Sequence, residues 1–174
     1  MDGSPMWFTL ETASNDIMPH SVYYFMDMVD KKVWDNTVFV HDEVHILSTV
    51  LASPEGEDKK HLVESPLAFP ENSDVFQHEP YTFGFSNLGP QFNLNFHENA
   101  NNHEPNGKSL NALSDTDPCF ARVVIGGESI KQLKKKSENN KGEEKIYTTI
   151  ETVRNIILSP ERRREIGIPV TQQR

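Results

Sequence analysis

The sequence predicts a mainly β fold, a closed or nearly closed antiparallel β-barrel capped by two α-helices. Two observations lead to this prediction. About six or seven short runs rich in β-branched and aromatic residues are separated by turn residues along the chain. Two segments with helical periodicity accompany them, one near each end. With 174 residues, of which 36% are hydrophobic, the chain fits one domain.

The N-terminal part supplies a strand, the clearest helix and two more strands. Residues 7–12 alternate apolar and polar side chains, which predicts a strand. Pro19 suits a first helical turn, and an apolar stripe at spacings of three and four residues follows it: Val22, Phe25, Met26, Val29 and Val33. Residues 37–40 and 44–51 are rich in β-branched residues and are predicted strands.

Long loops separate the strands in the middle of the chain. Residues 52–80 contain four prolines among polar residues and are predicted to be mostly loop. Residues 81–85 and 92–96 are predicted aromatic strands. Residues 97–117 form a polar stretch with five asparagines. A loop of about 20 residues in a compact domain is often functional.

The last part of the predicted domain contains two strands and the second helix. Residues 120–125 predict a strand, Gly126-Gly127 a turn and residues 128–135 a short helix. The Lys/Glu/Asn-rich run 134–145 is typical of disorder. Residues 146–158 predict the final strand.

Charge is divided unevenly between the predicted domain, residues 7–158, and a charged tail, residues 159–174, that we expect to be flexible. Residues 1–120 carry 19 acidic and 5 basic side chains, whereas residues 121–174 carry 7 and 12, for a net charge of −9. An acidic surface repels the phosphate backbone, so we expect no nucleic-acid binding over the main domain. The basic tail remains able to contact an anionic partner.

The cysteine count and the hydropathy pattern exclude several classes. Cys119 stands alone, which excludes an intramolecular disulfide and a cysteine-based zinc site. No apolar run reaches the roughly 20 residues of a membrane-spanning helix, and residues 1–16 lack the pattern of a signal peptide. We expect a monomeric intracellular protein, unless the chain is the incomplete product of a longer gene.

Three segments carry a resemblance to a known family: residues 19–25 (PHSVYYF), 86–92 (SNLGPQF) and 120–130 (FARVVIGGESI). They resemble, in that order, the first helix, the Ala-Asn…Gly-Ser-Gln-Phe-Phe stretch and the Phe-Gly-Lys-Val strand with its glycine turn in the cyclophilin family of peptidyl-prolyl cis-trans isomerases. The resemblance extends over about residues 7–158. It implies a cyclophilin-like barrel without a cofactor whose partner is a Pro-containing peptide or protein segment.

Rotation about an X-Pro bond crosses a barrier of about 20 kcal/mol. A catalyst needs an apolar cup for the proline ring and a donor that favours the pyramidal nitrogen of the transition state. The resemblance assigns the donor role to an Arg in a Phe-His-Arg stretch. The matching stretch here is Phe39-Val40-His41, so His41 stands at the position of that Arg.

Other positions of the expected groove are also replaced. By the resemblance, Ile46 falls near a pocket Phe, Ser48 stands where a Gln is expected, and Asn93 replaces the second Phe of the proline cup. A pocket Trp has no counterpart, and Asp117 takes the place of a pocket His, with His103 the nearby imidazole. The expected substrate-binding residues are therefore His41, Ile46, Ser48, Asn87, Gln91 and Asn93, and no residue is assigned as catalytic.

Two hypotheses follow from these replacements. In the first, the domain binds Pro-containing segments with weak or no isomerase activity. In the second, it is an active isomerase in which His41, Gln91 and Asn87 share the work of the missing cation. Losing the cation and most of the apolar cup favours the first hypothesis.

A further departure concerns a strand that family barrels place before residues 7–12. Either this barrel lacks it and has an exposed edge, or the chain is incomplete.

Two short motifs suggest a specific chemistry, a zinc site and a cysteine nucleophile, and each also has a purely structural interpretation. The run His41-Asp42-Glu43-Val44-His45 suggests a zinc site, but its Glu is displaced by one residue from the helical His-Glu-x-x-His motif and its context is a strand. Cys119 with His103 and Asp117 suggests a nucleophile, yet catalytic partners are seldom close in sequence. We favour structural roles for both motifs, and solvated roles for the basic runs 134–136 and 162–164 over nuclear targeting.

Overall fold

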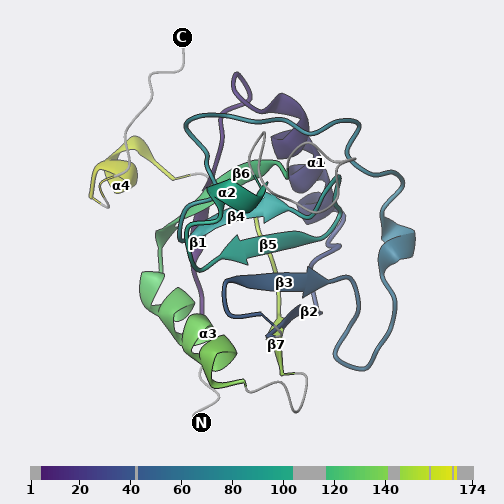
Figure 1. Cartoon of the computed structure of the whole chain (residues 1–174). Coiled ribbons are helices and arrows are strands. Elements are labelled where there is room, and N and C mark those ends of the chain that lie inside the picture. Colours follow the sequence, from purple (N-terminus) through teal and green to yellow (C-terminus); the bar gives the residue numbers. More distant parts are fainter. Residues whose placement is uncertain are drawn as a thin grey trace.

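A single antiparallel sheet of seven strands organises the part of the chain that the computed structural model describes, residues 5–41, 43–103, 117–140, 146–156, 158–165 and 167. The strands follow the order β1-β6-β4-β5-β3-β2-β7 and curl strongly (Figure 1). Their bounds are β1 Thr9–Thr12, β2 Thr37–Val40, β3 Ile46–Val50, β4 Thr82–Phe85, β5 Phe92–Asn95, β6 Cys119–Ile125 and β7 Tyr147–Ile150.

Two long helices lie on opposite sides of the curled sheet (Figure 1). They are α1, Pro19–Asp30, and α3, Gly127–Asn139. Shorter helical turns occur at η1, Lys60–Leu62, α2, Ala100–His103, and α4, Pro160–Glu165. The predicted mainly β fold class, an antiparallel sheet curled into a barrel-like shape with two helices, is therefore confirmed. Of the two predicted forms, closed or nearly closed, the closed one is not observed among the described residues: the sheet curls strongly, and β1 and β7 remain its end strands. No helix among the described residues has the length and hydropathy needed to cross a membrane.

Aromatic side chains fill the interior of the curled sheet. Phe92 on β5 lies at the centre of this core, with ring centroids 4.6 Å from Trp34 and 5.5 Å from Phe83. Phe25 of α1 contacts Phe92 and Phe120 at 5.8 and 4.9 Å. All of these rings are buried. Each buried aromatic contributes a few kcal/mol, so this cluster supplies much of the free energy that holds the helices to the sheet.

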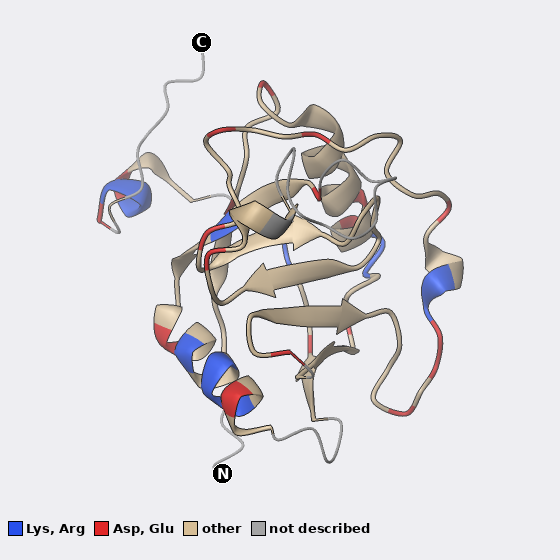
Figure 2. Cartoon of the chain, viewed as in Figure 1, with Lys and Arg blue, Asp and Glu red and all other residues tan. Residues whose placement is uncertain are grey.

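The second helix is longer than its predicted range of 128–135, and that prediction is wrong at its C-terminal end. Ile130, Leu133 and Ser137 are buried at spacings of three and four residues, which carries the helix through the lysine run to Asn139. Figure 2 shows the Lys and Glu residues of α3 on its ribbon, whereas most of the sheet is free of charge. The rest of the run predicted to be disordered, residues 141–145, lies outside the described residues.

The final strand is shorter than its predicted range of 146–158. Only residues Tyr147–Ile150 belong to β7, because the ladder with β2 ends where Thr37 pairs with Ile150. The chain then continues without a regular partner. Within the predicted tail, residues 160–165 form α4, and Arg163 of this helix contacts Glu11 of β1 at 3.2 Å.

The N-terminus of α1 is capped by a carboxylate from the Pro-rich loop. Met18, the residue that precedes the helix, offers no side-chain cap. Instead the Glu71 carboxylate accepts hydrogen bonds from the backbone N–H groups of His20 and Ser21, at 3.2 and 2.7 Å. A negative charge there also interacts favourably with the helix dipole. The distant loop is thereby tied to the helix that closes the core.

We predict that Glu71→Ala lowers the free energy of unfolding by about 1 kcal/mol, the usual cost of losing an N-terminal cap. Urea denaturation monitored by circular dichroism measures the change. Glu64→Ala is the matched control, because Glu64 pairs with the exposed Lys31 at 3.3 Å and such exposed pairs contribute about 0.5 kcal/mol or less. Equal effects of the two substitutions would show that Glu71 does not cap the helix.

Candidate functional site

A polar row crosses the outer face of the sheet at its middle strands. Leu47 of β3 and Leu94 of β5 are register partners, and both are fully buried in the core. Because side chains alternate along a strand, the neighbouring residues Ile46, Ser48 and Asn93 face outward. Ser48 pairs with Asn93, which in turn pairs with Gly84 of β4, and both polar side chains are partly exposed.

The imidazole of His78 lies directly over Gly84 at the end of this row. A Cβ atom on Gly84 would stand 2.5 Å from Cε1 of His78, so only glycine leaves room for the ring. His78 is 3% exposed although it comes from the loop that precedes β4. Because Gly84 has no side chain, the His78 ring can pack directly against the sheet.

Hydrogen bonds determine the tautomer of His78. Its Nε2 lies 2.8 Å from the carbonyl oxygen of Asp117, which can only accept, so Nε2 carries the proton. Nδ1 then accepts from the Asn95 amide at 3.1 Å. Burial lowers the pKa of His78 below its ordinary value of 6.5, and the neighbouring His103 adds to this, while the hydrogen bond to the Asp117 carbonyl opposes it. His78 is accordingly neutral at pH 7.

The same network continues through two buried asparagines. Asn95 on β5 donates to the Thr82 hydroxyl at 3.1 Å, and its carbonyl accepts from the Asn99 amide at 2.9 Å. The Asn99 backbone N–H donates to the His78 carbonyl at 2.7 Å. Buried amides satisfied in this way hold their surroundings rigidly. The network fixes the loop before β4 and the start of α2 against the outer face.

A histidine–carboxylate pair lies beside this network. Nδ1 of His103 lies 2.7 Å from Oδ2 of Asp117, and the two side chains are 21% and 15% exposed. The other carboxylate oxygen accepts the backbone N–H of Asn87 at 2.7 Å. Nε2 of His103 has no hydrogen-bond partner within the described part of the chain. A carboxylate that orients one ring nitrogen leaves the other able to bind or exchange a proton.

The structure places His41 away from the outer face. This side chain is fully buried, with Nδ1 2.8 Å from the Ser137 hydroxyl of α3 and Nε2 2.8 Å from the Thr148 hydroxyl of β7. The Asn140 side chain also donates to the His41 carbonyl. His41 thus joins β2, α3 and β7, and its ring has no exposed surface with which to contact a peptide.

The other predicted site residues divide into two groups. Ile46, Ser48 and Asn93 share the outer face, as described. Gln91 is partly buried, and its amide donates to the Thr49 carbonyl at 3.2 Å. Asn87 is exposed beside Asp117 and has a left-handed backbone (φ 55°), which asparagine tolerates.

The sequence analysis did not identify the buried network around His78. Its residues come from a proline-rich loop, two strands and a polar stretch, and no local spacing connects them. The one signal was Gly84 between two phenylalanines of a strand, because a glycine inside a strand often marks the close approach of another group. His103 and Asp117 had been noted as sequence neighbours of Cys119 and, by the resemblance, at or near the position of a pocket His, but not as a pair beside this network.

The zinc-site and cysteine-nucleophile motifs can now be located in the fold. Cys119 is buried, and its thiol donates to the Gln77 carbonyl at 3.2 Å. Within the described ranges, no group of three His, Cys, Asp or Glu side chains could hold a metal ion. His41 and Cys119 are thus both buried, and each makes a hydrogen bond within the fold.

The comparisons with known proteins connect this architecture to one fold. No protein-family model and no curated protein matches the sequence. Among solved structures, the chain is similar to a Cryptosporidium parvum cyclophilin-type peptidyl-prolyl cis-trans isomerase determined in the presence of the dipeptide Ala-Pro. That match has a TM-score of 0.56 and 15% sequence identity, and it covers 83% of this chain and 89% of the other.

A second structure of the same Cryptosporidium parvum protein matches with a TM-score of 0.50 and 13% identity, over 73% of this chain and 76% of the other. At such identities the similarity is one of fold. The chain therefore has a cyclophilin-like fold, as the three sequence segments had suggested.

We predict that His41→Leu lowers the free energy of unfolding by about 2–3 kcal/mol, because it leaves the buried Ser137 hydroxyl without its imidazole partner and removes the contact to the partly buried Thr148 hydroxyl. Chemical denaturation measures this change. The same substitution at His45, which is only partly buried, is the control and should cost less than about 0.5 kcal/mol. A stable His41→Leu protein would contradict the structural role given to His41.

The lowered pKa of His78 predicts a loss of stability in acid. Below about pH 6.5 the unfolded chain binds a proton on this residue, whereas the folded chain does so only at a lower pH. The contribution of His78 is thus fully present above pH 6.5 and declines as the pH falls below it. The His78→Gln variant should lose less unfolding free energy than the wild type between about pH 7.5 and pH 5.5.

The control for this comparison is His61→Gln, which changes an exposed histidine on η1. This variant shows whether replacing a histidine outside the buried network changes the pH profile of stability. If His78→Gln and the wild type lose the same free energy between the two pH values, the buried neutral state of His78 is wrong.

Proposed function

We propose that the outer face of β3 and β5 binds extended, Pro-containing peptide segments and accelerates their isomerisation weakly or not at all. The observation that carries the proposal is the polar row formed by Ser48 and Asn93 on the outer face of a cyclophilin-like fold. The fold similarity supports the choice of ligand, because the related Cryptosporidium parvum structure was determined with Ala-Pro.

The chemistry of the row suits recognition of a peptide backbone. The amide of Asn93 and the hydroxyl of Ser48 both donate and accept hydrogen bonds, as the N–H and C=O groups of an extended segment require. Ile46, on the same face, offers apolar surface for a proline ring. Since Gln91 already donates to β3, we assign it the role of holding the row in place.

The weak activity follows from the position of His41. Catalysis needs a preorganised donor aimed at the prolyl nitrogen in the transition state. The residue at the expected position of the cation is buried between α3 and β7, where both ring nitrogens are occupied. Asn93 also puts an amide where the resemblance expects an aromatic floor, so the proline ring loses apolar contact.

One observation favours a second candidate, an active isomerase with a rearranged donor. The His103–Asp117 pair lies next to Asn87 and leaves Nε2 of His103 without a partner among the described residues. In its doubly protonated form, the His103 ring would present Nε2–H as a charged donor beside His78, at the end of the row. This candidate uses Asn87, as the active-isomerase hypothesis required, but not His41.

We predict that the peptide Ala-Ala-Pro-Phe shifts the backbone amide signals of Ser48, Asn87 and Asn93 in heteronuclear NMR spectra. The expected dissociation constant is about 0.1–1 mM, or 4–5.5 kcal/mol, as suits a short flexible ligand. Ala-Ala-Ala-Phe is the matched control peptide and should produce smaller shifts. The absence of shifts on this face would contradict the proposal.

Exchange spectroscopy on the same samples separates the two candidates. With a binding module, cis-trans exchange stays near the uncatalysed time of tens of seconds. An active isomerase would accelerate exchange more than about tenfold, and His103→Gln would abolish that acceleration while the exposed-site control His61→Gln would not.

A further inference from the structure

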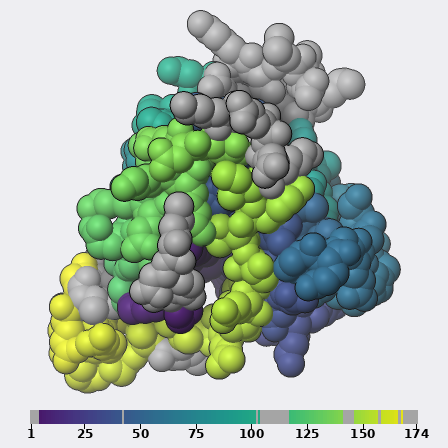
Figure 3. Space-filling model, turned by 90° about the horizontal axis from the view of Figure 1, so that it is seen from below, coloured from purple at the N-terminus to yellow at the C-terminus, as the bar shows by residue number. Residues whose placement is uncertain are grey.

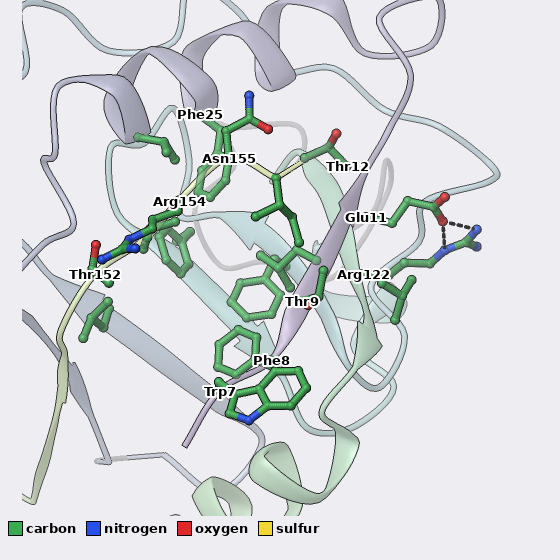
Figure 4. Close-up of a pocket in the computed structure, with 18 of the residues that line it drawn as sticks. Trp7, Phe8, Thr9, Glu11, Thr12, Phe25, Arg122, Thr152, Arg154 and Asn155 are labelled. Carbon is green, nitrogen blue, oxygen red and sulfur yellow. Dashed lines mark hydrogen bonds and ion pairs between the residues drawn. The ribbon is translucent and has the colours of Figure 1, made fainter. Parts of the chain in front are cut away.

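The curled sheet does not close on itself, and its two end strands border one large hollow. Within the described residues β1 pairs only with β6, and β7 pairs only with β2. Both β1 and β7 line the hollow together with α1, α3 and the segment after β7. Figure 3 shows the molecule from this side, and Figure 4 shows β1 along one side of the hollow and residues 152–155 along another.

The directions of the strands specify what could fill this gap. All six neighbouring pairs in the sheet are antiparallel. With seven strands in alternating directions, β1 and β7 run the same way. They cannot close the barrel as an antiparallel pair, but one added strand between them would be antiparallel to both. Eight strands also give a barrel whose interior side chains just fill.

The lining of the hollow has the composition of a protein-binding surface. Of the nine large hydrophobic side chains that are exposed among the described residues, four line it: Trp7, Ile17, Tyr147 and Ile156. Trp7 is 65% exposed and stands at the mouth beside Phe8 (Figure 4). Exposed large apolar side chains that line one concave surface are typical of interaction sites. The hollow measures about 2520 Å³, well beyond the ~300–1,000 Å³ of small-molecule sites.

The charges around the hollow favour an acidic occupant. Five basic and three acidic side chains line it, in a chain whose net charge is −9. Glu11 is already paired with Arg122 and Arg163, at 2.8 and 3.2 Å. Arg154 and two lysines of α3, Lys135 and Lys136, remain around the rim against two carboxylates. Carboxylates on the solvent side of an added strand would therefore find cations near them.

We propose that this hollow binds one extended strand of a partner protein, hydrogen-bonded to both β1 and β7. Its side chains would alternate, with aliphatic residues facing the core and acidic residues facing solvent. Main-chain hydrogen bonds to two edges supply affinity, and the apolar interior selects the alternating pattern. This proposal uses the opposite side of the barrel from the polar row and is independent of the function proposed above.

The test uses a synthetic peptide with the sequence Glu-Val-Thr-Val-Glu-Val-Thr-Val-Glu, ~30 Å long when extended. Binding should shift the fluorescence of Trp7 to shorter wavelength and protect it from iodide, because Trp34 is already buried. Three control peptides are a reordered one without alternation, one with proline at the centre, and one with lysine for each glutamate. Each should bind at least tenfold more weakly, the second because proline removes a backbone donor.

Two exposed positions give variants that should still fold. Trp7→Ala and Tyr147→Ala should each weaken binding at least fivefold by calorimetry. Tyr23→Ala, which removes a 74% exposed aromatic of α1 outside the hollow, should leave binding unchanged. Urea denaturation of all three variants verifies that they are folded.

Several outcomes would overturn the proposal. Equal binding of all four peptides, or no binding of the alternating peptide up to millimolar concentration, would exclude a strand-binding site. Dimerisation that Trp7→Ala abolishes in sedimentation experiments would identify a second copy of the chain as the occupant instead. Failure of Ala-Ala-Pro-Phe to bind bears only on the polar row, so the two proposals fail separately.

Discussion

The register between β3 and β5 is the constraint on which the rest of the structure depends. Leu47 opposite Leu94 puts both side chains into the core, and the two-residue period then fixes every neighbour. Phe92 points inward to the centre of the aromatic cluster, while Asn93 points outward. A slip of one residue would bury Asn93 and Ser48 and expose the leucines. The hydrophobic core therefore also determines the polar outer face.

Much of the fold could be predicted because its signals are local. The apolar stripe after Pro19 predicted α1, and short β-branched runs predicted most strands to within about two residues. The helix and strand ends that differed from the prediction depend on tertiary contacts. The burial of Ser137 in the fold extends α3 to Asn139, and the four-residue length of β2 limits the ladder that defines β7. Because such partners lie far away in the sequence, no local pattern predicts them.

The candidate site was harder to predict for a related reason. Position relative to a family motif suggested that His41 faces a groove, whereas hydroxyls from α3 and β7 hold it inside. Conversely, His78 gains its importance from a strand glycine and from Asn95, which the fold brings to it over 17 residues. Local sequence identifies which side chains have the necessary chemistry, but burial and partners decide which of them can use it.

The hollow between β1 and β7 and the polar row both involve β5. In the strand order, β5 and β3 lie near the middle, whereas β1 and β7 lie at the ends. Because the sheet curls, the hollow between β1 and β7 lies across the barrel from the polar row. Phe92 is one of the residues lining the hollow, and the next residue along β5, Asn93, faces the row. Because interiors are closely packed and transmit strain, a strand that fills the hollow would bear on Phe92 and thus on the backbone that carries Asn93.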